Sequence, residues 1–213
     1  MNKIETSVGE VWLVSGETSL CLSEDIAFGI ERSPIDGGEL CNSTADPKLA
    51  RTLAICYFCP AEGRYVVAED ESEWALLRQF WDCYMRAKAS GSKMIGYNLV
   101  GYDLLFLIRR SWLMGVTVPR DAIMFSAGPY HNDTIIDLKD VWMCGMYDGF
   151  VSLDDLAKYF GVGETTSHEL FHVLWQKNHQ EAVEHLVTRV RLMHGCAVNM
   201  GLMPRTHWVI CGA

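Results

Sequence analysis

The sequence predicts an α/β domain in which helices cover a mixed β-sheet. Strand-like segments come first, helical and strand-like segments then alternate, and the chain ends in helices, an order typical of this fold class. The 213 residues are 49% hydrophobic, enough to bury one sizeable core, and no repeat, low-complexity tract or linker divides them. We therefore expect one domain over residues 25–202, between an N-terminal extension (1–24) with no clear period and room for a short strand, and a C-terminal tail (203–213).

The predicted sheet begins directly after Asp25. Apolar residues alternate with small or polar ones over residues 26–31, the period of a strand with two different faces, so Gly29 and Glu31 should point to the same side. A loop rich in Pro and Gly (33–48) follows. The other predicted strands are 49–58 and 64–68, which can pair as a hairpin, and the short apolar segments 93–97 and 134–138.

Four helices are expected around this sheet. Apolar and aromatic residues recur at helical spacing over 71–88, and the segment 102–114 is apolar nearly all round, which predicts a buried helix. Ser152 is a good N-cap residue, with Asp155 at the third helical position. The last helix, 180–200, places an apolar stripe on one side.

Charge and cysteine content limit the function classes. The formal net charge of −9 argues against a broad basic surface, although a local basic groove is compatible with it. With no membrane-length apolar run and no signal peptide pattern, we expect a cytoplasmic protein without membrane contact. Cys56 and Cys59 form a C-x-x-C, but with no second such pair we expect core or surface thiols instead of a zinc or redox site.

Two segments resemble motifs of the DEDD 3′–5′ exonuclease superfamily. The segment 26–34 resembles the first motif, an apolar residue followed by Asp-x-Glu-Thr, with Gly29 in the Asp position and Arg32 in the Thr position. The segment 96–111 resembles the second and most specific motif, Asn-x-x-x-aromatic-Asp followed by an apolar helix; it supplies Asn98 and Asp103.

The third motif, Tyr-x-x-x-Asp-Val, is similar to residues 184–192, with His185 in the Tyr position and Arg189 in the Asp position. The resemblance covers roughly residues 25–202, and the branch it resembles most is the predicted exonucleases related to the proofreading domain of family B DNA polymerases. It implies a ribonuclease H-like fold: a mixed sheet flanked by helices.

The resemblance also implies a two-metal reaction. In such enzymes two Mg²⁺ or Mn²⁺ ions, about 4 Å apart, activate a water and stabilise the leaving oxygen of a phosphodiester, and hard cations of this kind take oxygen ligands. Glu31 and Asp103 are then the metal ligands and catalytic carboxylates, and His185 orients or deprotonates the water. Taken alone, Asp103 is also a plausible helix-terminal acid, and His185 an ordinary surface histidine.

Asn98 and Arg109 are the candidate substrate-binding residues. Asn98 opens the second motif, and Arg109, with Arg110 and Lys139, could line a groove for phosphates. The alternatives are that Asn98 is only a turn residue and that the two arginines belong to a solvated helix face.

Two of the four expected carboxylates are missing. Gly29 has no side-chain oxygen, and Arg189 carries a permanent positive charge that repels a cation. Our hypothesis is that Arg189, together with Arg32, replaces the metals by pairing with Glu31 and Asp103. In the alternative, Arg189 turns outward and the two acids are solvated in an open cleft.

The sequence thus favours a degenerate exonuclease-like domain, inactive or weakly active, that holds single-stranded DNA or a 3′ end. One alternative is an active Mg²⁺- or Mn²⁺-dependent exonuclease that recruits other carboxylates to complete a metal site, namely Asp25, Asp36 or Asp137. A second alternative is a protein-binding scaffold without nucleic-acid contact, which needs no metal.

Overall fold

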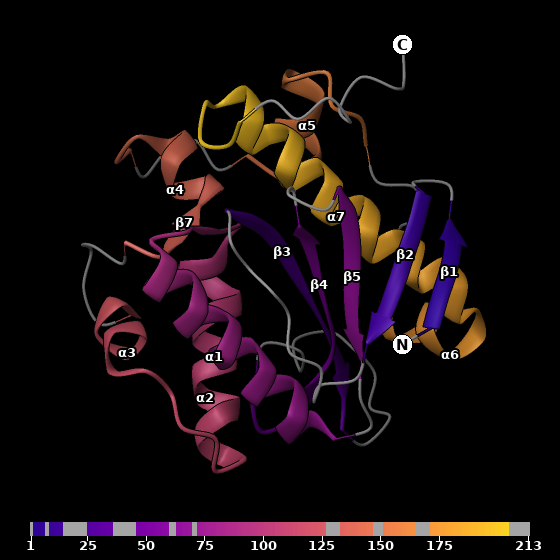
Figure 1. Ribbon diagram of the computed structural model, residues 1–213, viewed down its shortest axis with the longest axis vertical. Helices are drawn as coiled ribbons and strands as arrows, with labels where there is room; N and C mark the ends of the chain where they lie inside the picture. Colours follow the sequence, from indigo (N-terminus) through magenta and orange to yellow (C-terminus); the bar gives the residue numbers. More distant parts are fainter. Residues whose placement is uncertain are drawn as a thin grey trace.

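The computed structural model describes nine stretches of the chain: residues 2–6, 9–14, 25–35, 46–59, 63–69, 72–126, 133–146, 151–164 and 171–204. In them a seven-stranded sheet has the order β1-β2-β5-β4-β3-β6-β7, with helices on both faces (Figure 1). The strands are β1 (Asn2–Thr6), β2 (Gly9–Val14), β3 (Ile26–Pro34), β4 (Ala50–Cys59), β5 (Arg64–Glu69), β6 (Met94–Gly96) and β7 (Ile135–Asp137).

The sheet is mixed, as predicted. Strand β3 lies inside it, antiparallel to β4 and parallel to β6. Strand β5 is antiparallel to β4, and β7 is parallel to β6. The carboxyl ends of the parallel strands β3, β6 and β7 therefore lie at the same end of the sheet. Strand β6 leads from this end into the second motif, and β7 leads into residue 138.

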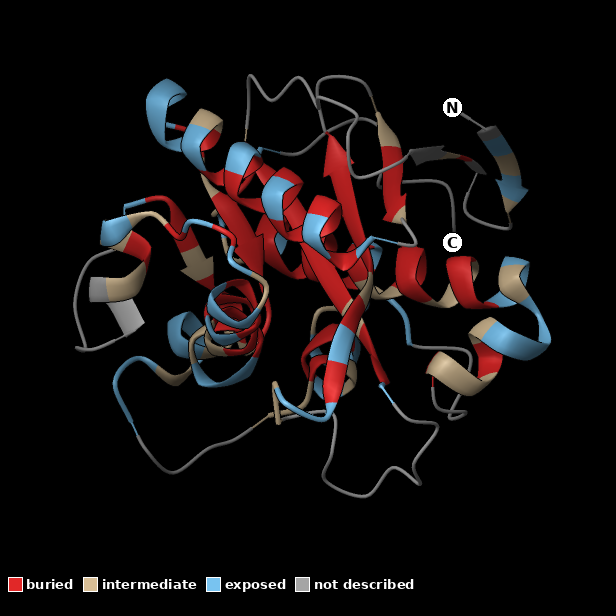
Figure 2. Cartoon of the chain, turned by 90° about the horizontal axis from the view of Figure 1, so that it is seen from below, coloured by how far each residue is buried: buried red, intermediate tan, exposed pale blue. Residues whose placement is uncertain are grey.

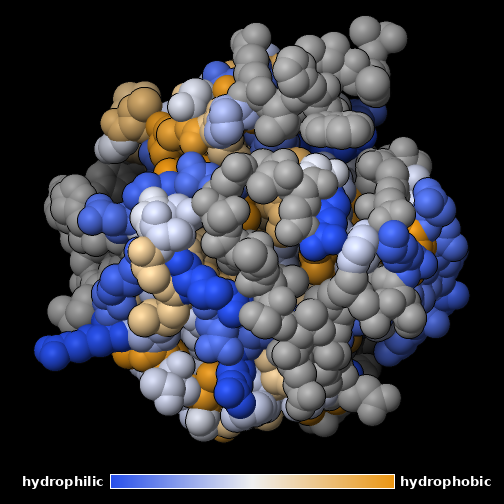
Figure 3. Space-filling view, in the orientation of Figure 1, coloured by the Kyte–Doolittle hydropathy of each residue, from blue (hydrophilic) through white to orange (hydrophobic). Residues whose placement is uncertain are grey.

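Two layers of helices cover the sheet. On one face lie α1 (Glu73–Ser90), α2 (Leu104–Leu113) and α3 (Arg120–Ser126), and on the other α6 (Phe171–Lys177) and α7 (His179–Asn199). Two short helices, α4 (Leu138–Met143) and α5 (Leu153–Tyr159), pack near the end of α7. Buried residues fill the strands and the inner sides of the helices (Figure 2), while hydrophilic residues predominate along the exposed side of α1 (Figure 3).

The helix α5, Leu153–Tyr159, begins where the sequence predicts. The Ser152 hydroxyl accepts a hydrogen bond from the backbone N–H of Asp155, at 3.1 Å, which satisfies one of the amides left free at the start of a helix. The predicted helix 102–114 differs in its first turn. A π-helical turn, η3 (Leu99–Asp103), precedes α2, so the second motif lies in this wider turn.

The N-terminal segment contributes more than the predicted short strand. Strand β2 pairs in parallel with β5, and β1 adds to β2 in an antiparallel hairpin, so the sheet extends beyond the predicted domain start at residue 25. The pairing of β2 with β5 joins segments about fifty residues apart in the chain. No local sequence pattern specifies such a partner.

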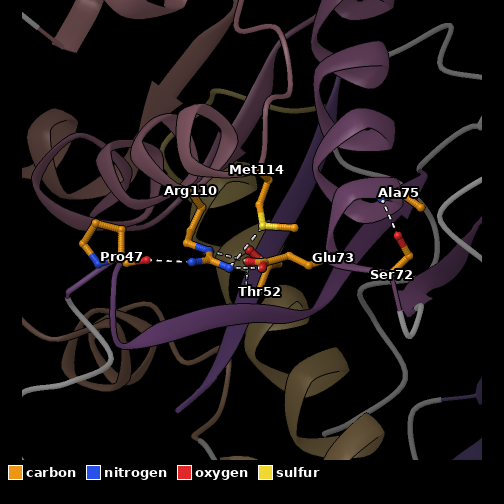
Figure 4. A network of polar contacts seen from close by, with 7 residues as sticks. All are labelled: Pro47, Thr52, Ser72, Glu73, Ala75, Arg110 and Met114. Atoms are coloured by element: carbon orange, nitrogen blue, oxygen red, sulfur yellow. Dashed lines mark hydrogen bonds and ion pairs between the residues drawn. The ribbon is translucent and has the colours of Figure 1, made fainter. Parts of the chain in front are cut away.

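A buried ion pair joins α1, α2 and β4 (Figure 4). Arg110 donates through Nε to Glu73 Oε1, at 2.9 Å, and through Nη2 to Glu73 Oε2, while its Nη1 donates to the Pro47 carbonyl at 2.8 Å. Glu73 also accepts the backbone N–H of Thr52. Forked Arg–carboxylate pairs of this kind are geometrically specific, so the network fixes how the two helices meet the start of β4.

The C-x-x-C thiols belong to the core, as predicted. Cys56 and Cys59 are free and buried, and they contribute to the two different hydrophobic clusters on opposite faces of the sheet. Burial raises the pKa of the Cys56 thiol well above its ordinary value. Two thiols on opposite faces of one strand cannot share a zinc ion.

Among the helices of the described residues, none combines the length and the apolar character needed to cross a bilayer.

Candidate functional site

Two oppositely charged side chains of strand β3 lie on the two faces of the sheet. Glu31 and Arg32 are consecutive, and the pairing of β3 with β4 shifts by a bulge between them. Glu31 contacts Arg189 on α7, whereas Arg32 contacts Asp103, the last residue of η3. Each of the two predicted site carboxylates therefore has an arginine partner, and the two pairs lie on opposite sides of one strand.

The pair on the α2 side is buried. Arg32 Nη2 donates to Asp103 Oδ1, and the two side chains are only 6% and 11% exposed. The Arg32 guanidinium also lies over two aromatic rings, 4.0 Å from the centroid of Tyr102 and 4.5 Å from that of Phe106. Burial lowers the Arg32 pKa, but a guanidinium stays charged at physiological pH. This arginine is held on several sides.

Asp103 is therefore not an ordinary helix cap. Its side chain makes no cap hydrogen bond to α2, and its carboxylate faces Arg32 instead. Aromatic residues one position before it and three positions after it, Tyr102 and Phe106, line the guanidinium. That aromatic spacing was available in the sequence and is the signal that could have identified Arg32 as the partner.

The pair on the α7 side is more open. Arg189 Nη1 donates to Glu31 Oε1, and the Arg189 side chain is 32% exposed against 12% for Glu31. The predicted pairing of the two arginines with the two acids is thus confirmed, and the alternative in which Arg189 turns away from both acids is wrong. The roles of Glu31 and Asp103 as catalytic residues or metal ligands stay predictions.

Gly29 faces the same helix as Glu31, as the strand period predicts. A Cβ atom at Gly29 would lie 3.1 Å from Val190 Cγ2 and 3.7 Å from both Leu186 Cδ1 and Met193 Cε. The first of these contacts is tighter than ordinary van der Waals packing. The position that the resemblance gives to a metal-bridging Asp is therefore closed by apolar side chains of α7, a feature that the sequence analysis missed.

His185 lies one helical turn before Arg189. Its Nδ1 atom is buried and has no hydrogen-bond partner within the described stretches. Burial lowers the His185 pKa, the negative charge of Glu31 opposes this, and the positive charge of Arg189 adds to it. The lowered pKa favours a neutral imidazole at pH 7, and its action on a water molecule stays a prediction.

Asn98 is a turn residue whose side chain is already engaged. Its backbone is left-handed, with φ of 56°, and its Oδ1 accepts a hydrogen bond from Lys139 Nζ at 3.0 Å. The carboxylate of Asp137 holds this turn by accepting the backbone N–H groups of Asn98 and Val100, at 2.7 and 2.9 Å. The geometry confirms the turn interpretation of Asn98, and substrate binding by its side chain stays a prediction.

The carboxylates considered for a rearranged metal site have other partners. Asp137 holds the Asn98 turn, and Asp25 Oδ1 accepts the backbone N–H of Lys93 at 2.7 Å. Asp36 lies outside the described residues. Among the residues that the structure describes, no group of three or more His, Cys, Asp or Glu side chains could hold a metal ion.

The structure contradicts the predicted phosphate groove at one of its three residues and leaves the other two untested. Arg110 is buried and paired with Glu73, so its assignment to the groove is wrong; the sequence pattern could not show that α2 turns this side chain inward. Arg109 is exposed on α2, and its contact with a substrate stays a prediction. Lys139 faces Asn98.

No family model matches the chain, and no curated protein matches it. A solved structure of the family B DNA polymerase from the hyperthermophilic archaeon Pyrobaculum calidifontis is similar, with a TM-score of 0.59 and 22% sequence identity. The match covers 82% of this chain and 24% of the polymerase chain, so this chain spans about a quarter of that protein. The likeness supports the predicted fold: the chain is a ribonuclease H-like α/β domain.

Proposed function

We propose that this chain is an exonuclease-like domain that does not hydrolyse phosphodiester bonds and that holds a single-stranded nucleic-acid end. One observation carries the first half of the proposal: both carboxylates that remain from the exonuclease motifs, Glu31 and Asp103, are paired with arginines. A carboxylate whose charge is neutralised by a guanidinium is a poor ligand for a divalent cation.

The donor set does not fit two divalent metal ions. The resemblance calls for four carboxylates, and Gly29 and Arg189 supply none. The two that remain bring two negative charges, which Arg32 and Arg189 balance with two positive charges. A Mg²⁺ ion at Glu31 would have to displace the guanidinium of Arg189, and one at Asp103 the guanidinium of Arg32, which lies over two aromatic rings.

The nucleic-acid half of the proposal rests on the motif order and on the fold. The three motif segments of the sequence meet around β3 in a ribonuclease H-like domain, and the similar solved structure is that of a DNA polymerase. The net charge of −9 limits the number of phosphates the surface can contact, so we expect weak and salt-sensitive binding.

A protein-binding scaffold is the second candidate, because large apolar side chains are exposed near α4 and α5. Near α4 and α5, Trp142 stacks on Tyr159 with ring centroids 5.9 Å apart, and Tyr159 and Met146 are 66% and 65% exposed. Exposed apolar clusters often mark protein contacts. An electrophoretic shift with single-stranded DNA at two salt concentrations separates the candidates, since only the first predicts binding that weakens with salt.

Inactivity is tested by attempting to rebuild the metal site. We would digest a labelled single-stranded oligonucleotide with Mg²⁺ and with Mn²⁺, comparing the natural chain with a variant that combines Gly29→Asp, Arg32→Thr, Arg189→Asp and Val190→Ala. The first three changes supply the motif residues and remove the arginines, and the fourth makes room for the new Asp. The matched control adds Glu31→Gln to the same variant.

We expect trimming from the 3′ end by the rebuilt variant only, and loss of that activity in the control. Degradation by the natural chain that Glu31→Ala abolishes would contradict the proposal and would favour an active enzyme with rearranged ligands. A folded rebuilt variant that binds the oligonucleotide without cutting it would show that substitutions at these four positions are not sufficient to create a metal site.

A further inference from the structure

The two arginines at the motif positions differ in what they can still bind. We propose that Arg189 is a metal-independent phosphate ligand: its guanidinium donates to a phosphate oxygen of the bound strand at the place where the motif position calls for a metal ligand. This inference rests on the proposed nucleic-acid binding and specifies how the strand is held.

Arg189 has donors to spare and a route to solvent. A guanidinium carries five N–H groups in a planar fork, and one nitrogen of Arg189, Nη1, donates to Glu31. The Arg189 side chain is 32% exposed, against 6% for that of Arg32, so solvent reaches it more readily. Planar, forked donors match the oxygen pairs of a phosphate, which is why arginine is favoured at phosphate sites.

The position of Arg189 is fixed in advance by the packing of α7. Its neighbours in the chain, Thr188 and Val190, are both buried, with 4% and 0% exposure. Val190 lies against Gly29, so α7 approaches β3 closely at this point. The ion pair with Glu31 orients the Arg189 guanidinium. A phosphate would therefore meet N–H donors whose side chain loses little conformational entropy on binding.

Arg32 cannot serve in the same way. Its side chain is 6% exposed, donates to Asp103, and contacts the rings of Tyr102 and Phe106. We therefore assign Arg32 to the stability of the domain and Arg189 to the ligand. The division predicts that substitutions at the two arginines have different effects on binding and on folding.

Glu31 weakens the proposed contact because its charge neutralises Arg189. Removing that charge with Glu31→Gln should raise the affinity for single-stranded DNA, by about fivefold for a partly exposed pair. A metal site predicts the opposite sign, since Glu31 would then be a ligand of the cation that holds the phosphate. The direction of this one change distinguishes the two mechanisms.

The binding test uses a fluorescent single-stranded oligonucleotide and fluorescence anisotropy, in EDTA and in Mg²⁺. We expect equal affinity in both, a loss of about tenfold or more for Arg189→Met, and a salt dependence shallower by roughly 0.7 in log–log slope. Arg191→Met is the matched control, because Arg191 is exposed on the same helix two residues further on and should change neither quantity appreciably. If Arg189→Met does not fold, the double variant Glu31→Gln, Arg189→Met removes the unpaired charge and is compared with Glu31→Gln alone.

A second readout separates this inference from the proposed function. Inorganic phosphate is titrated in EDTA against the protein labelled with ¹⁵N-arginine, and the Nε–H signal of Arg189 is assigned by its absence in Arg189→Met. Two outcomes would overturn the inference while the proposed function stands. One is nucleic-acid binding that requires Mg²⁺, and the other is an Arg189 signal that neither the oligonucleotide nor phosphate shifts. A phosphate-induced shift at Arg189 without any strand binding would overturn the proposed function and, with it, the assignment of Arg189 to a bound strand.

Discussion

The sharpest prediction concerns Asp103, the carboxylate of the buried pair. In the substitution Asp103→Asn the side chain keeps its shape and loses its charge, which leaves the Arg32 guanidinium without its counterion at 6% exposure. Breaking a buried ion pair by removing one partner costs about 3–5 kcal/mol. Asp103 makes no cap hydrogen bond to α2, so loss of helix capping does not account for the effect.

The assay is urea unfolding followed by circular dichroism, together with a thermal melt. For a domain of this size, 3–5 kcal/mol corresponds to a fall in Tm of roughly 6–20 °C. Glu31→Gln is the comparison, because its partner Arg189 is 32% exposed and the pair should contribute only about 0–1 kcal/mol. Replacing both buried partners, with Arg32→Met and Asp103→Leu, should recover most of the loss, because apolar side chains can replace a buried pair.

The opposite result would refute this reasoning. A metal-binding carboxylate that sits among like charges is repelled in the metal-free protein, so its neutralisation leaves stability unchanged or raises it. If Asp103→Asn is as stable as the natural chain or more stable, Asp103 is not the counterion of Arg32 in solution.

Three further predictions concern His194, Glu73 and Cys144. Burial lowers the pKa of His194 from 6.5 to about 4, so between these pH values the unfolded chain takes up a proton that the folded chain does not, and the free energy of unfolding should fall by up to about 3 kcal/mol as pH drops from 6.5 to 4. The urea midpoint of His194→Leu should depend less on pH than that of the natural chain, and an equal dependence would contradict a buried, neutral His194. Glu73→Gln breaks the network around Arg110 and should lower the free energy of unfolding by about 3 kcal/mol without changing strand affinity, which the same melt and anisotropy assay check. Among the five described thiols, Cys144 alone is exposed, so a thiol reagent under native conditions should modify it far faster than Cys56 or Cys196. Mass spectrometry of the digested protein measures the labelling, and rapid labelling of Cys56 would contradict its place in the core.

The sequence predicted the elements whose patterns are local. The alternation over residues 26–31 placed Gly29 and Glu31 on one side of a strand, and both face α7 in the structure. The cap at Ser152 fixed the start of α5. The parallel pairing of β2 with β5 was not predictable in this way, because it depends on contacts between distant segments that leave no local period.

The site was predictable in its charges and less so in its geometry. The two arginines at motif positions suggested pairing with the two acids, but which arginine meets which acid depends on where α2 and α7 cross β3. The approach of Val190 to Gly29 and the inward turn of Arg110 are likewise properties of the packed helices. A sequence motif names the side chains of a site, whereas the space between them is set by the whole fold.

The carboxylates at the motif-like positions are therefore weak grounds for inferring catalysis by this domain. Asp103 has a structural reason to persist, because its loss would leave Arg32 buried without a counterion. An Asp at Gly29 would place its Cβ atom 3.1 Å from Val190 Cγ2, so the Val190 side chain would have to shift to admit it. Both the charges and the space around β3 differ from what a two-metal site needs, so we expect that no single substitution creates one and that partly substituted variants are less stable than the natural chain.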